Sequence, residues 1–221
     1  MSNQLTLYTG ISPYSERVEI ALLEAHAKFT RYEIDLSNKP GWFQSQVNPA
    51  GKIPAITYGG PEVPPDQPSP ESVKLNESLV LVEFIADLYP ESGILPKDPV
   101  LRAKARLFIE FVSTKLLQVF RAGINLQNVD ILVQAFEEIQ ALLPPTGFAV
   151  GEFSIADISI GPFLSRLELR LGHDLGPWPA GTGEGPKILA LLHQPKLTRI
   201  WEYLKDVQAR PSFAATFKKV G

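Results

Sequence analysis

The chain has 221 residues, no cysteine, and a formal net charge of −3 from 21 basic and 24 acidic side chains. The lack of cysteine excludes a disulfide framework, thiolate metal sites and a cysteine nucleophile. A mildly acidic chain is not typical of general nucleic-acid binding, and no apolar run reaches the roughly 18 residues of a membrane span. The N-terminus shows no basic region followed by an apolar run, so we expect a cytoplasmic protein.

Strand and helix patterns alternate in the first ninety residues. After the first strand, Ser12 and Pro13 are residue types favoured at the cap and the first position of a helix. A strand, a helix and a second strand in succession require a parallel pair with a right-handed crossover. The pattern predicts strands at 4–8, 29–36, 53–58 and 73–75, and helices starting at 13, at 40–47 and at 77–88.

Only helical patterns follow the polar, Pro-rich stretch 91–98. We therefore expect an α/β N-terminal domain over residues 1–90, a linker over 91–98 and an all-α C-terminal domain over 99–221. The expected helices of the second domain span 102–123, 129–143, 154–171 and 195–209, with a terminal turn at 212–219.

The segment Gly59–Ser72 contains five prolines between two predicted strands that a tight hairpin could join. Such a density of proline prevents ladder pairing and favours extended, solvated backbone. Two interpretations stay open: a tolerated surface insertion, or a Pro-rich docking peptide.

Ser12 lies where the first strand gives way to the first helix. Backbone N–H groups and the positive end of the helix dipole meet there, so this position suits an anion such as a thiolate. The alternative is that Ser12 only caps the helix.

Two further segments have the chemistry of a peptide-binding site. Asn48–Ile56 combines a turn with Ile53-Pro54, where a proline opens a strand and leaves the backbone of Ile53 available to an extended peptide. Glu77 and Ser78 begin the third helix, where a hydroxyl and N–H groups suit a carboxylate and Glu77 suits an ammonium group. Each segment alone is also compatible with an ordinary loop or helix start.

In this order and spacing, the segments resemble those of the glutathione S-transferase family, mostly its omega class, with some tau-like character. The resemblance covers nearly the whole chain. It rests on SPYSERV (12–18), NKPGWF (38–43), NPAGKIPAI (48–56), NESLVLVEFIADLYP (76–90) and FSIADISIGPFLSRLE (153–168), the last with a capping box from Ser154 to Asp157.

The resemblance implies a thioredoxin-like N-terminal domain that binds glutathione and a helical domain with a pocket for the second substrate. Ser12 matches the catalytic position, and Ile53, ahead of a cis Pro54, matches the residue whose backbone pairs with the cysteinyl unit. The remaining matches are Lys39 and Lys52 toward the glycyl end of glutathione, and Glu77 and Ser78 at its γ-glutamyl group.

One position departs from the omega pattern, because omega enzymes typically carry cysteine where this chain has Ser12. A serine cannot form a mixed disulfide with glutathione, but it can donate a hydrogen bond to the glutathione thiolate. We therefore expect conjugation to electrophiles, a detoxification reaction, or peroxide reduction, rather than disulfide reduction.

The pocket for the second substrate is expected to take hydrophobic or aromatic molecules. The alternative for its two cations, Lys115 and Arg166, is that both extend to solvent. The residues assigned to this pocket are Ile11, Tyr14, Phe111, Lys115, Arg166 and Trp178.

Other functions are less compatible with the residues. A serine hydrolase needs a histidine base, yet His26 ends a helix, His173 and His193 lie in loop-like stretches, and no GxSxG elbow occurs. His173-Asp174 has no cysteine at metal-ligand spacing, so we expect no metal. The resemblance also implies a homodimer. The remaining alternative is a non-catalytic carrier or regulatory protein with the same fold.

Overall fold

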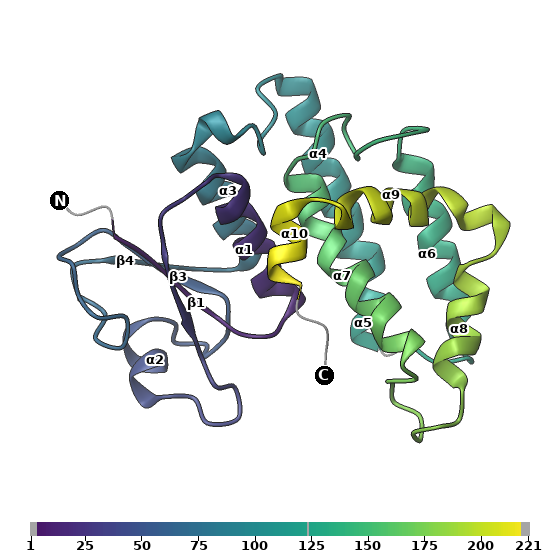
Figure 1. The fold of residues 1–221 in the computed structure, drawn as a ribbon, viewed down its shortest axis with the longest axis horizontal. Helices are drawn as coiled ribbons and strands as arrows, with labels where there is room; N and C mark the ends of the chain where they lie inside the picture. The colour runs from purple at the N-terminus through teal and green to yellow at the C-terminus, as the bar shows by residue number, and fades with distance from the viewer. Residues whose placement is uncertain (1–3, 123, 218–221) are drawn as a thin grey trace. The chain divides into compact units, whose positions relative to one another are not determined.

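The computed structural model describes residues 4–122 and 124–217 and divides into two compact units between Leu95 and Pro96 (Figure 1). This division lies inside the stretch 91–98. The predicted end of the first long helix at Gly123 and the end of the terminal turn at 218–219 lie outside the described residues.

The first unit contains a mixed four-stranded sheet in the order β2-β1-β3-β4. Strand β1 pairs with β2 in parallel, which confirms the predicted parallel pair, and β3 pairs antiparallel to both β1 and β4. The strands are β1 (Leu5–Thr9), β2 (Thr30–Glu33), β3 (Ala55–Tyr58) and β4 (Val73–Asn76), and the helices are α1 (Pro13–Glu24), α2 (Gly41–Gln46) and α3 (Ser78–Leu88), followed by the 3-10 turn η1 (Pro90–Ser92).

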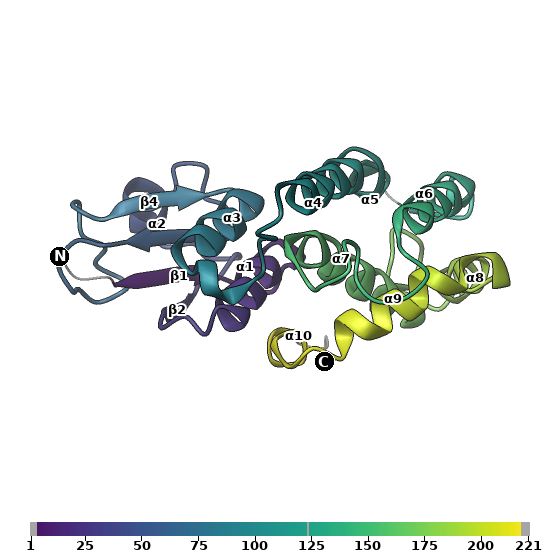
Figure 2. The same cartoon turned by 90° about the horizontal axis from the view of Figure 1, so that it is seen from above.

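Helices cover both faces of this sheet. Leu7 and Tyr8 are neighbours in β1 and therefore point to opposite faces, yet both are fully buried. Helix α1 packs against α3, as two views of the ribbon show (Figures 1 and 2), and the ring of Tyr8 contacts Phe43 of α2. The predicted order of strands and helices in this unit is confirmed.

Two strands are shorter than predicted. β2 ends at Glu33 because Asp35 turns the chain, its carboxylate accepting hydrogen bonds from the backbone N–H and the hydroxyl of Ser37. The ladder of β3 begins at Ala55 because Pro54 has no N–H to donate.

Half of the Pro-rich segment 59–72 is exposed, in keeping with its composition, but the segment is not extended throughout. It forms turns, and Ser69 and Ser72 within it are buried. The side-chain amide of Gln4 holds the segment at Val63, donating to its carbonyl over 2.8 Å and accepting from its N–H over 3.1 Å. The prolines thus belong to a folded loop that packs on the sheet domain.

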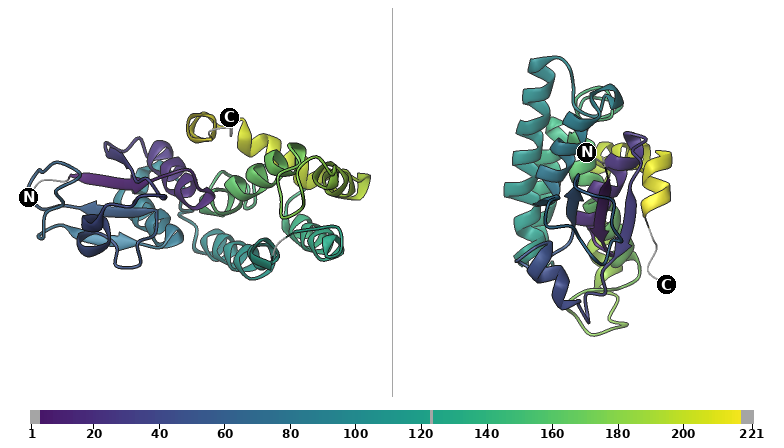
Figure 3. Two further views of the ribbon diagram at one scale, coloured as in Figure 1. Left: turned by 90° about the horizontal axis from the view of Figure 1, so that it is seen from below. Right: turned by 90° about the vertical axis from the view of Figure 1, so that its left-hand side faces the viewer.

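The second unit is all helical, as predicted, and α7 lies at its centre in contact with α4, α8 and α9 (Figures 2 and 3). Its elements are α4 (Pro99–Phe111), the π-helical segment η2 (Val112–Leu116), α5 (Leu117–Ala122), α6 (Val129–Leu142), α7 (Ile155–Gly172), α8 (Glu184–Leu192), the 3-10 turn η3 (Pro195–Leu197), α9 (Thr198–Gln208) and α10 (Pro211–Thr216).

Two features of this unit differ from the prediction. The helix predicted at 102–123 is interrupted by η2, and α8 was not predicted at all. Glycine and proline around the start of α8 favour a loop in sequence terms. The carboxylate of Asp174 instead accepts hydrogen bonds from the N–H groups of Gly183 and Gly185 and caps that helix.

The predicted capping box at the start of α7 is confirmed and extends into a buried network. The Ser154 hydroxyl accepts from the N–H of Ala156, while the Asp157 carboxylate accepts from the N–H groups of Ser154 and Ala149. The Tyr203 hydroxyl donates to Asp157 over 2.9 Å and so ties α9 to α7. Burial raises the pKa of Asp157, and these hydrogen bonds act against that rise.

Replacing Asp157 with alanine should lower the free energy of unfolding by about 3–5 kcal/mol, because it leaves several buried donors without a partner. Urea unfolding followed by circular dichroism measures this loss. The matched control is Asp206→Ala, an exposed carboxylate in α9, which should change stability by less than about 0.5 kcal/mol. Equal unfolding midpoints for the two variants would contradict the role given to Asp157.

Candidate functional site

Three of the predicted binding segments meet at one edge of the sheet. The register places Ala55 of β3 opposite both Tyr8 of β1 and Asn76 of β4. Because β3 runs opposite to its two neighbours, the chain enters β3 at the edge where β1 and β4 end. The candidate residues next to this row are Ser12, Ile53 and Glu77.

Ser12 caps helix α1. Its backbone is extended, and its hydroxyl oxygen accepts a hydrogen bond from the N–H of Tyr14 over 3.2 Å. Capping uses a lone pair of the hydroxyl and leaves its hydrogen to be donated elsewhere. The side chain is only half-buried. The two interpretations of Ser12, as a helix cap and as a donor to a bound thiolate, are therefore compatible.

The peptide bond between Ile53 and Pro54 is cis, as the resemblance implies. The turn before it is held by Asn48, whose side chain donates to the carbonyl of Lys52 over 2.7 Å and accepts from the N–H of Ala50. The paired part of β3 begins two residues after Ile53. The backbone of Ile53 thus lies just outside the ladder, where an extended peptide could pair with it.

Lys39 and Lys52 are both exposed. The ammonium group of Lys39 donates to the carbonyl of Gly51 over 2.9 Å and so joins the segment before α2 to the turn before β3. This contact places the two cations on adjacent segments. Such an arrangement suits a carboxylate at the end of a peptide.

Glu77 and Ser78 occupy the start of α3. Glu77 has a φ of 71° and a ψ of 108°, a conformation that non-glycine residues rarely adopt and that is found mostly at functional positions. Its side chain is exposed, whereas Ser78 is buried and begins the helix. The first N–H groups of α3 have no partner within the helix, so this end can accept an anion.

Arg17, which the sequence analysis did not single out, contacts the candidate residue Ser78. Its side chain is fully buried in α1, and its Nη1 donates to the hydroxyl oxygen of Ser78 over 3.2 Å. Its guanidinium also lies over the ring of Tyr14, 5.6 Å from the ring centre. A cation within the α1–α3 contact thus lies behind the start of α3.

Burial lowers the pKa of Arg17 to about 9, and the nearby Tyr14 partly opposes this shift. At neutral pH the guanidinium still carries its charge. One sequence signal could have indicated its placement: Arg17 is one helical turn before Ala21, which belongs to the buried face of α1.

The residues assigned to the second-substrate pocket are divided between the two units. Ile11 and Tyr14 belong to the first, where Ile11 is 61% exposed. In the second, Lys115 pairs with Glu138 over 3.9 Å. The exposed placement of Lys115 agrees with the alternative that its charge reaches solvent.

Arg166 and Trp178 have partners within the second unit. The Arg166 guanidinium is buried and lies 4.6 Å from the ring centre of Phe217. It therefore does not extend to solvent. The indole N–H of Trp178 donates to the carboxylate of Asp174 over 2.8 Å, which holds the ring against its own loop.

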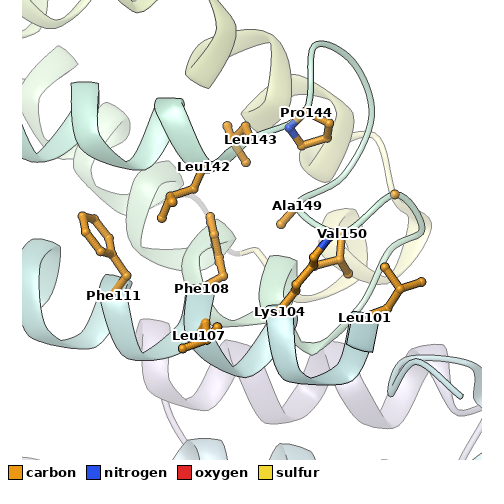
Figure 4. A pocket seen from close by; sticks show the side chains of 11 residues that line it. Leu101, Lys104, Leu107, Phe108, Phe111, Leu142, Leu143, Pro144, Ala149 and Val150 are labelled. Carbon is orange, nitrogen blue, oxygen red and sulfur yellow. The ribbon is translucent and has the colours of Figure 1, made fainter. Parts of the chain in front are cut away.

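Phe111 lines an apolar hollow inside the second unit (Figure 4). The hollow has a volume of about 720 Å³. Lys104 is the only charged residue among those lining it, and Lys115, Arg166 and Trp178 are not part of the lining. The lining residues are Leu101, Lys104, Leu107, Phe108 and Phe111 of α4, Leu142 of α6, and Leu143, Pro144, Ala149, Val150 and Gly151 of the segment that follows.

Among residues 4–122 and 124–217, none of the helices combines the length and the apolar character of a membrane-spanning helix. No three histidine or acidic side chains in the same ranges gather closely enough to hold a metal ion.

Comparison with known proteins shows which family the chain resembles over most of its length. The family model for the glutathione S-transferase N-terminal domain matches residues 8–93, and that for the C-terminal domain matches residues 119–206. The crystal structure of glutathione transferase Omega 1C from Trametes versicolor is 56% identical with a TM-score of 0.93, covering 99% of this chain and 92% of that one.

Two other relatives broaden the comparison. Omega 2S from Trametes versicolor, solved in complex with 2,4-dihydroxybenzophenone, is 46% identical with a TM-score of 0.90, covering 98% of this chain and 94% of that one. Glutathione S-transferase L1 of Arabidopsis thaliana is 25% identical over 72% of this chain, which spans 64% of that relative's length. The chain belongs to the glutathione S-transferase family, and it is similar to the omega-class members.

Proposed function

We propose that the protein is a glutathione transferase that holds the thiolate of glutathione at Ser12. The observation that carries this proposal is the convergence of Ser12, Ile53 and Glu77 on one edge of the sheet. Glutathione would lie extended along the backbone of Ile53, with its thiol toward Ser12 and its glycyl carboxylate toward Lys39 and Lys52.

The two charges of the γ-glutamyl group match the start of α3. Its carboxylate would accept hydrogen bonds from the first N–H groups of the helix and from the Ser78 hydroxyl, and its ammonium group would pair with Glu77. Arg17 donates to the oxygen of Ser78, so the hydroxyl hydrogen of Ser78 is left to point at the carboxylate. Arg17 would thus act through Ser78 as a positioning residue, with its charge adding to the attraction.

The chemistry follows from a hydroxyl that donates and cannot be oxidised to a disulfide. A hydrogen bond from Ser12 to the sulfur favours the thiolate, which is the nucleophile. In conjugation the sulfur forms a bond to an electrophilic carbon, and the leaving group departs with its electron pair. In peroxide reduction the sulfur attacks an oxygen of the hydroperoxide, the O–O bond breaks, and the departing oxygen takes a proton.

Ser12→Ala should depress conjugation by roughly 10- to 100-fold, since a hydrogen bond to a charged group is worth about 1.5–3 kcal/mol. Ser12→Cys should raise reduction of glutathione mixed disulfides, because it supplies the missing thiol. Both rates are measured by steady-state turnover with a chromogenic electrophile and with a glutathione mixed disulfide. Wild-type protein that reduces the mixed disulfide as fast as it conjugates would refute the role of Ser12.

Arg17→Met should weaken glutathione binding by about 1.5 kcal/mol or more, roughly tenfold, while leaving the unfolding free energy equal or higher. Binding and stability should change in different directions. The buried charge of Arg17 costs stability, whereas its N–H donor orients Ser78. Calorimetry and urea unfolding measure them. Adding Ser78→Ala to Arg17→Met should cause little further loss, because the two groups act as one unit. Affinity that stays within twofold in Arg17→Met would exclude Arg17 from the site.

A second function, binding of flat aromatic ligands, is favoured by the apolar hollow of the helical unit. Phe108 and Phe111 offer aromatic surface there, and Lys104 offers a charge for a phenolate or carboxylate (Figure 4). Its volume of about 720 Å³ lies within the usual range of small-molecule sites. The benzophenone complex of the similar Omega 2S protein supports this class of ligand. Leu107 in the lining is 70% exposed and also suits contact with a second copy of the chain, in keeping with the expected homodimer.

Lys104→Met should weaken binding of the anionic probe anilinonaphthalene sulfonate about threefold or more, with the loss reduced by added salt. The variant keeps the apolar stem of the side chain, so only the charge is removed. Lys97→Met, an exposed lysine outside the lining, is the control and should leave the affinity unchanged. Probe fluorescence measures both. Equal affinities, or a probe displaced fully by glutathione conjugates alone, would place the ligand elsewhere.

A further inference from the structure

We propose that the folded Pro-rich segment 59–72 positions helix α2 and the glutathione-binding residues beside it, and that it acts through the hydroxyl of Tyr8. This inference rests on the proposed function for its ligand, but its structural part can be tested without glutathione.

The segment is joined to strand β1 and to the residue directly before that strand. Gln4 binds Val63 through both atoms of its side-chain amide, and the hydroxyl of Tyr8 donates to the carbonyl of Pro65 over 2.7 Å. Within the segment, the N–H of Gln67 bonds the carbonyl of Pro64. The segment therefore has a defined conformation and a defined place on the sheet.

The hydrogen bond from Tyr8 involves a buried side chain, and the Tyr8 hydroxyl is always its donor. Tyr8 has no exposed surface, and burial raises the pKa of its hydroxyl, so the group stays a donor at neutral pH. Removal of the hydroxyl would leave the Pro65 carbonyl without this donor, and an unpaired polar group next to a buried side chain is unfavourable. The hydrogen bond thus links the position of the segment to that of the Tyr8 ring.

The ring of Tyr8 is in turn part of the packing that holds α2. Its centre lies 5.9 Å from that of Trp42 and 5.8 Å from that of Phe43, both in α2, and 5.9 Å from that of Tyr32. The cluster includes buried Val47, and Ile53 packs against it. One aromatic side chain therefore contacts the Pro-rich segment at its hydroxyl and α2 at its ring.

Helix α2 depends on such packing because it has little stability of its own. It is six residues long, and Pro40 at its start makes no side-chain capping bond. A helix of this length does not persist without tertiary contacts. Lys39 lies two residues before α2, and the turn carrying Lys52 follows the helix. A shift of α2 would therefore move both proposed partners of the glycyl carboxylate.

The test uses Tyr8→Phe and a chain in which residues 59–72 are replaced by Asn-Gly, a two-residue hairpin connection. Each change should raise the KM for glutathione about three- to tenfold, with kcat at saturating glutathione and the KM for the electrophile unchanged. Combining the two changes should add nothing, because both remove the same link. Tyr58→Phe is the matched control, since the ring of Tyr58 packs on Phe84 instead.

Amide hydrogen exchange over residues 39–53 is the readout that needs no ligand. We expect faster exchange there in Tyr8→Phe and in the shortened chain, and wild-type exchange in Tyr58→Phe. Unchanged exchange and unchanged KM in the shortened chain would overturn the inference, as would additive effects of the two changes. Faster exchange in a protein whose wild type binds no glutathione would uphold the positioning of α2 and overturn only the proposed function. Should Tyr8→Phe fail to fold, Gln4→Ala releases the other anchor and should give the same pattern.

Discussion

The pairing register of Tyr8, Ala55 and Asn76 is the constraint on which the site depends. It aligns the ends of β1 and β4 with the beginning of β3, so three chain segments distant in sequence come to one edge. Strands β1 and β4 lead to helices α1 and α3. The third segment enters β3 through Ile53, whose backbone lies outside the ladder. A one-residue slip of β3 would turn its side chains to the other face and misplace Ile53. The sheet therefore brings the candidate binding residues together at this edge, and no single loop could do so.

The buried cation of Arg17 lowers the stability of this arrangement. Because burial depresses the folded-state pKa of Arg17 to about 9, the charged guanidinium lowers stability at every pH below that value. The cost diminishes as the pH rises above 9 and the folded chain loses the proton. An apolar side chain would pack there at lower cost, so stability does not explain the arginine. The contact of Arg17 with Ser78 explains why an arginine is present, if an anion binds at the start of α3.

A site residue could be predicted from the sequence where its interactions are with near neighbours in the chain, and not where its partner is distant in sequence. Ser12, Ile53 and Glu77 carry local signals, since helix starts and prolines are visible in a few neighbouring residues. Arg17 carries none that is specific, because its partner lies 61 positions away in the sequence. The order of elements in the first unit was predictable from alternation and periodicity. Helix α8 was not, because the carboxylate of Asp174 that caps it comes from outside the helix.

The π-helical segment Val112–Leu116 interrupts the single helix that the sequence predicts over residues 102–123. A π turn accommodates one residue more than an α turn, and each residue advances an α-helix by about 100°. Side chains after Leu116 consequently face a direction that a continuous α-helix would give to their neighbours. Deleting one residue from this segment would restore an unbroken α-helix and leave the side chains of α5 facing the directions that they face now. A wider turn can thus absorb a length change of a single residue in this helix, with no substitution at any contact.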